Sequence, residues 1–123
     1  MPARQELSNF IRSTFRSVWA LELLCFLKQH RDRTWRQSDL VVALRGSELV
    51  VSHSVESLLA AGLVVVEEGQ LVRYQPTSDA VDGLANAAES LYASRPDAVR
   101  RIIVAPPSTG LSSFADAFKL WRD

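Results

Sequence analysis

The feature that most constrains the fold is a change of apolar spacing at Gly62. Before this glycine, apolar residues over 47–61 recur at three- and four-residue steps, which is the spacing of one buried helix face. After it come two β-prone runs, 63–66 and 71–74, separated by a short segment that contains Gly69. Glycine permits a sharp turn because it has no side chain to clash. The pattern therefore predicts a helix that runs directly into a tight hairpin.

Two further helices are expected ahead of this unit. Apolar side chains recur with helical spacing along residues 7–29, which predicts one long helix. Residues 37–45 form a second expected helix, ended by Gly46, since glycine can take the left-handed closing conformation. Ser47 then has the side chain of a helix N-cap, because its hydroxyl can accept a bond from a free backbone N–H.

The last third of the chain returns to helical spacing. Residues 78–94 predict one helix, and Pro96 suits the first turn of another. A last amphipathic piece over 111–121 carries the apolar residues Leu111, Phe114, Ala115, Phe118 and Trp121. We divide the chain into residues 1–76 and a helical extension over 77–123. This extension is expected to complete the core, packed either on the same domain or on the partner of a homodimer.

The predicted fold class is mainly α with a small β-hairpin. The order helix, helix, tight turn, helix, hairpin over residues 18–75 resembles the winged helix-turn-helix domains of bacterial transcription regulators. The stretch 55–64, VESLLAAGLV, looks like the end of their recognition helix and its turn into the wing. The whole chain, including its ending 113–118, is similar to uncharacterised bacterial winged-helix proteins of about this length. The resemblance implies a winged helix-turn-helix with additional C-terminal helices, and transcription regulation through duplex DNA.

The resemblance also implies which residues would meet DNA. In such domains the third helix enters the major groove with its early outward residues, and the second helix crosses the backbone. Arg36 and Arg45 flank the second helix and are the expected phosphate contacts. The full set of candidate DNA-binding residues is Arg36, Arg45, Val50, His53, Ser54, Ser57 and Arg73.

The distribution of charge weakens the expectation of tight DNA binding. The net charge is zero, but residues 1–45 carry +4, residues 46–98 carry −6 and residues 99–123 carry +2. Phosphate neutralisation by Lys and Arg supplies most non-specific DNA affinity. The acidic residues on the expected reading helix and wing are Glu48, Glu56, Glu67 and Glu68.

Two functions therefore stay open at this point. One is a DNA-binding regulator that acts as a homodimer. The other is a winged-helix protein–protein interaction module that does not read DNA. The apolar pair Leu49 and Val50, ringed by glutamates, would suit a protein partner with a basic rim, such as another regulatory protein.

The sequence lacks the patterns of catalytic, metal and cofactor sites, so we expect no enzyme. The single cysteine, Cys25, lies in an apolar run and is expected to be a buried small hydrophobe. His30 and His53 have no partners at metal-ligand spacing, and there is no glycine-rich phosphate loop.

The composition is that of an ordinary globular protein, with 47% hydrophobic and 23% charged residues. No apolar run approaches the roughly 18 residues of a membrane span. The N-terminus lacks the apolar core and cleavage site of a signal peptide. We therefore expect a cytoplasmic protein that does not bind membranes.

Overall fold

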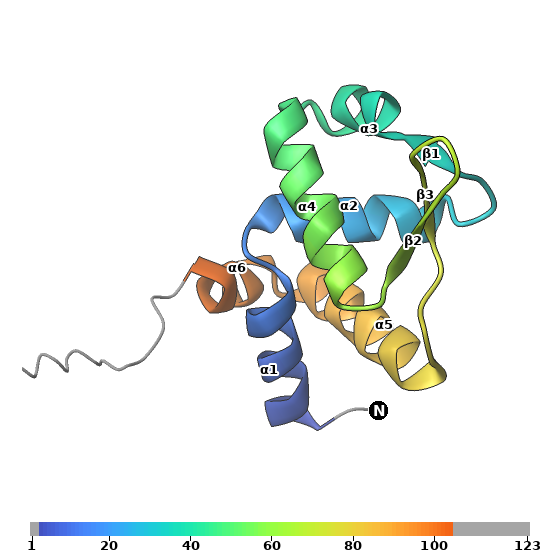
Figure 1. The fold of residues 1–123 in the computed structure, drawn as a ribbon. Coiled ribbons are helices and arrows are strands. Elements are labelled where there is room, and N and C mark those ends of the chain that lie inside the picture. Colours follow the sequence, from blue (N-terminus) through green and yellow to red (C-terminus); the bar gives the residue numbers. More distant parts are fainter. Residues whose placement is uncertain (1–2, 105–123) are drawn as a thin grey trace, which may run out of the picture.

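The computed structural model describes residues 3–104, which form six helices and three short strands (Figure 1). The elements are α1 (Arg4–Thr14), α2 (Val18–Gln29), β1 (Trp35–Arg36), α3 (Gln37–Leu44), α4 (Glu48–Ala60), β2 (Val64–Glu67), β3 (Leu71–Tyr74), α5 (Asp79–Ser94) and α6 (Pro96–Val104). The expected fold class is confirmed, because the described chain is mainly helical with a small antiparallel sheet. The expected helix over 111–121 lies outside the described residues.

The expected single helix over 7–29 is wrong, because the chain breaks between α1 and α2. Phe15 and Ser17 adopt extended backbone conformations, and the two helices run in clearly different directions (Figure 1). The break contains neither proline nor glycine, so packing must account for it. Ile11 and Phe15 are both buried, and α1 turns to pack on α5 and α6 while α2 contacts α4.

Helices α3 and α4 have the expected bounds to within one residue, but α3 closes differently. Arg45, rather than a glycine, takes the left-handed conformation, with φ 57°. Gly46 instead lies against a ring, since a Cβ there would be 3.4 Å from the Trp19 side chain. Ser47 caps α4 as expected, because its Oγ accepts a hydrogen bond from the Val50 N–H at 3.1 Å.

The expected hairpin is confirmed, and β1 adds a third strand to it. The sheet has the order β1-β3-β2, with both pairings antiparallel. Val64 faces Tyr74 across the ladder and Val66 faces Val72, which places the apolar face of the hairpin on the core. We call the β2–β3 hairpin the wing. Over residues 18–75, β1 is the one addition to the order of elements expected from the sequence.

Gly62 makes the turn between α4 and the wing. Its φ is +75°, and a Cβ on it would lie only 2.8 Å from the Thr77 Oγ1. The Gly62 carbonyl accepts a hydrogen bond from the Thr77 N–H at 2.9 Å, and the Leu63 carbonyl accepts one from the Gln75 N–H at 3.0 Å. The chain leaving the wing is therefore fastened to the end of α4, and the turn needs glycine both for its conformation and for room.

The described part of the C-terminal extension completes the core. Helix α5 packs on α1 and α2, and α6 packs on α1 and α5. Ala85, Ala88 and Val99 are buried in this contact. Residues 79–104 thus belong to the same folded unit as α1–α4 and the wing.

A polar seam joins α2, β3 and α5. Lys28 Nζ lies 2.7 Å from Glu89 Oε1, and its side chain is only 7% exposed. The Tyr74 hydroxyl donates to Asp82 Oδ1 at 2.6 Å, and Arg31 lies 3.8 Å from the same oxygen. Burial and the bond to Asp82 raise the pKa of Tyr74. We use the name polar seam for Lys28, Arg31, Tyr74, Asp82 and Glu89.

Candidate nucleic-acid interface

Helix α4 is the element expected to meet DNA, and one of its sides is accessible. Val51, Val55 and Leu58 are buried. Because successive residues of a helix are rotated by about 100°, the other side carries the expected contact residues. His53 is exposed, while Val50 and Ser57 are partly buried. The structure therefore brings three of the expected base-contact residues, Val50, His53 and Ser57, to one accessible surface.

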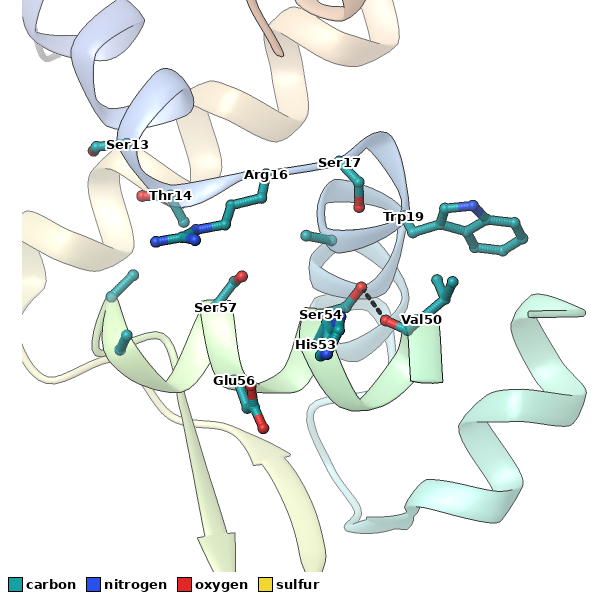
Figure 2. Close-up of a pocket in the computed structure, with 13 residues that line it drawn as sticks. Ser13, Thr14, Arg16, Ser17, Trp19, Val50, His53, Ser54, Glu56 and Ser57 are labelled. Atoms are coloured by element: carbon teal, nitrogen blue, oxygen red, sulfur yellow. Dashed lines mark hydrogen bonds between the residues drawn. The ribbon is translucent and has the colours of Figure 1, made fainter. Parts of the chain in front are cut away.

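Ser54 does not belong to that surface, which corrects its expected role. Its side chain is only 3% exposed, and its Oγ donates to the Val50 carbonyl at 2.8 Å (Figure 2). Ser54 lies on the flank of α4 that faces the segment between α1 and α2, and its hydroxyl is already bonded to the helix backbone.

Arg36 and Arg45 lie at the two ends of α3, as expected. The Arg36 N–H donates to Asp39 Oδ2 at 3.2 Å and so begins the helix, whereas the Arg36 side chain is exposed. The Arg45 side chain is exposed as well, and its left-handed backbone conformation ends α3. Within residues 3–104, neither arginine forms an ion pair. Both guanidinium groups are therefore available to an anionic partner.

The wing is less acidic in effect than its sequence indicates. Arg73 Nη1 lies 3.3 Å from Glu67 Oε2, and both side chains are 40% exposed. This pair neutralises one of the two glutamates of the wing and occupies Arg73, the seventh candidate contact. Glu68 lies at the hairpin turn and is exposed. The wing thus offers little net attraction to phosphate.

An open groove runs along α4 beside the candidate contacts. One wall is the segment from the end of α1 to the start of α2, and the other is the flank of α4 (Figure 2). Arg16 extends from the first wall over Ser57, and Trp19 projects past Val50. The groove has a volume of about 800 Å³. Its lining residues are Ser13, Thr14, Arg16, Ser17, Trp19, Ala20, Val50, His53, Ser54, Glu56, Ser57, Ala60 and Ala61.

Arg16 and Trp19 line the groove, a position that the sequence analysis did not predict. Neither residue is on the apolar stripe that predicts a helix over residues 7–29. The break between α1 and α2 instead places them against α4, and Trp19 keeps 39% of its surface exposed. The only available signal was Ser17, a residue type that favours helix N-caps.

The Cys25 thiol on α2 is held in its protonated form. Burial, together with Glu89 and Glu22 nearby, raises the pKa of the Cys25 thiol to about 12, so it stays protonated near neutral pH. Among residues 3–104, no three His, Cys, Asp or Glu side chains gather as metal ligands would. Within the same range, no helix is long and apolar enough to cross a membrane.

Comparison with known proteins adds no relative. No protein-family model, no curated protein and no solved structure gives a significant match to this chain. The function is therefore inferred from the geometry of α4 and its surroundings.

Proposed function

We propose that this chain is a winged-helix transcription regulator that binds duplex DNA through α4. The observation that carries the proposal is the pairing of an accessible α4 side with two exposed arginines, Arg36 and Arg45, at the ends of the preceding helix. The order of helices and strands supports it, because that order is typical of domains that place their third helix in the major groove.

Each residue has a distinct role in this proposal. Arg36 and Arg45 contact phosphates, which positions the domain without reading sequence. His53 and Ser57 offer polar groups to base edges, and Val50 offers a methyl surface to thymine. Ser54 is left out because it is buried. The glutamates Glu48 and Glu56 oppose phosphate, so we expect weak non-specific affinity with a modest salt dependence.

Fluorescence anisotropy with labelled duplexes at low salt tests the proposal. Arg36→Ala or Arg45→Ala should weaken binding to every sequence and reduce the slope of log K against log salt by about 0.9, the value for one lost phosphate contact. Arg101→Ala is the matched control, since Arg101 is an exposed arginine on α6. His53→Ala or Ser57→Ala should change the preference among sequences, at a cost of about 1–3 kcal/mol for a real base contact.

Equal losses from Arg36→Ala, Arg45→Ala and the Arg101→Ala control would contradict the proposed docking face. Wild-type protein that binds no duplex even at low salt, where electrostatic attraction is strongest, would contradict the regulator function altogether.

A protein–protein interaction module is the second candidate function, and exposed apolar side chains favour it. Leu49 is 65% exposed at the start of α4, and Val42 is 77% exposed on α3. Large apolar residues held in solvent are typical of surfaces that meet another protein. The glutamates beside Leu49 fit a partner with a basic rim. Absence of DNA binding together with loss of partner capture by Leu49→Asp would establish this function instead.

A further inference from the structure

The groove beside α4 has a mixed lining of apolar and polar side chains, with Arg16, His53 and Glu56 among the polar ones. Most side chains on its walls are small, chiefly Ser and Ala, so the space between the walls is left open. Trp19 and Val50 add larger apolar surface at one end (Figure 2). A volume of about 800 Å³ is within the usual range of clefts that enclose a ligand.

The sequence beyond the described residues contains a segment suited to such a groove. Leu111, Phe114, Phe118 and Trp121 follow one another at steps of three, four and three residues, which is the anchor spacing of a helix laid into a groove. Three of these four side chains are aromatic. Aromatic residues bury large apolar areas, so such a stripe favours contact with protein over contact with water.

Dimensions match between the segment and the groove. The groove follows α4 from Val50 to Ala61, which at 1.5 Å per residue is about 16 Å. A helix over 111–121 would be about 15 Å long by the same measure. The six residues 105–110 can span up to about 20 Å when extended. They begin after Val104 at the end of α6, and α6 packs on α1, whose last residues form one wall of the groove (Figure 1).

We propose that residues 111–121 dock as an amphipathic helix in this groove of the same chain. A short tether raises the effective concentration of the segment to the millimolar range, which favours this docking over capture of a second copy. The docked helix covers Val50, His53 and Ser57. Its regulatory consequence, competition between the segment and DNA for α4, rests on the proposed function.

The docking itself is tested by NMR on the full chain. Phe118→Asp places a charge on the apolar stripe, whereas Ser113→Asp places the same charge outside the stripe and is the matched control. Phe118→Asp should shift the Trp19 indole N–H and the Ala20 and Ala61 amides, and Phe114→Asp should shift the same signals. Ser113→Asp should leave them in place. The Trp19 signal is assigned with Trp19→Phe.

Several results would overturn docking within one chain. Groove signals that stay unchanged in both Phe118→Asp and Phe114→Asp would do so. Groove signals that revert on dilution, together with a dimer mass by light scattering, would show that the segment docks on a second copy. Unchanged resonances of buried core residues such as Leu24 verify that each variant is folded.

A separate measurement tests the competition with DNA. Phe118→Asp should bind duplex on the order of tenfold more tightly than wild type, as expected for an allosteric coupling of ordinary size, and Ser113→Asp should bind like wild type. Equal affinity of wild type and Phe118→Asp would overturn the regulatory consequence. If the groove signals shift but no variant binds DNA at low salt, the docking stands and the proposed function fails.

Discussion

Two serines of the α4 region, Ser47 and Ser54, both bond to the helix backbone. The Ser47 hydroxyl accepts a hydrogen bond from the free Val50 N–H at the start of the helix. The Ser54 hydroxyl donates one to the Val50 carbonyl. The sequence correctly indicated the first role, because a capping serine has a local signature. The burial of Ser54 could not be predicted in this way, since the segment that faces this flank of α4 is far away in the sequence.

Gly62 gives a sharp prediction for a single residue. Gly62→Ala should lower the free energy of unfolding by roughly 1–3 kcal/mol, because its φ is +75° and the new Cβ would crowd Thr77. Gly83→Ala is the control. A Cβ at Gly83 meets nothing within 4 Å, so alanine should raise the stability of α5 by roughly 0.5–1 kcal/mol. Urea unfolding measures both, and equal effects of the two variants would contradict this explanation of the turn.

Cys25 gives a prediction on pH. Its pKa is raised to about 12 in the folded chain from an ordinary value of 9.0, so folding favours the protonated thiol. The resulting stabilisation is complete below pH 9 and is lost as pH rises from about 9 towards about 12. Between pH 8 and pH 10.5, urea unfolding should show a steeper loss of stability for wild type than for Cys25→Ala.

Thiol labelling is an independent measure of the same property. At pH 8, Cys25 should react at least about tenfold more slowly in the folded protein than in urea, because the thiolate is the reactive form. Parallel pH curves for wild type and Cys25→Ala, or equal labelling rates, would show that the thiol is not perturbed by folding.

At the scale of elements, local signals predicted most of the fold. The hairpin, α3, α4, α5 and the start of α6 at Pro96 all follow from apolar spacing, caps and turn residues. The break between α1 and α2 does not, because the apolar stripe continues through Phe15 with helical spacing. Only the packing of α1 on α5 and α6 separates the two helices, and those contacts join residues far apart in the sequence.

The polar seam gives a prediction about elements. Glu89→Gln should lower the free energy of unfolding by about 1–3 kcal/mol, because it leaves the nearly buried Lys28 ammonium without an anionic partner. Glu67→Gln is the matched control, since it breaks the more exposed pair with Arg73 and should cost much less. Urea unfolding at neutral pH compares them, and equal losses would mean that the seam does not hold α2 to α5.

For the whole molecule, the sequence indicated where α4 lies but not what surrounds it. The candidate contacts Arg36, Arg45 and His53 are exposed as expected, since their accessibility follows from the helix pattern. The groove could not be predicted, because it forms between α4 and a segment whose course depends on the break after Thr14.

The homodimer stays a prediction. Of the two apolar stripes that motivated it, the one on α5 packs against the core of the chain, and the one over 111–121 lies outside the described residues. Val104 is 69% exposed at the end of α6, which leaves apolar surface beside residues already packed on the core. Light scattering at high micromolar concentration should give twice the 13.7 kDa chain mass, and Val104→Asp should lower it. Arg101→Asp is the control on the same helix. A mass of 13.7 kDa for wild type would contradict the dimer.

The bond between Tyr74 and Asp82 connects the base of the wing to the start of α5. Tyr74 ends the second strand of the wing, and Asp82 lies in the first turn of α5. Because of this bond, a tilt of the hairpin either moves α5 with it or breaks the bond. A partner that bends the wing would therefore pull on α5. Binding at the wing would then displace a helix that the partner does not contact.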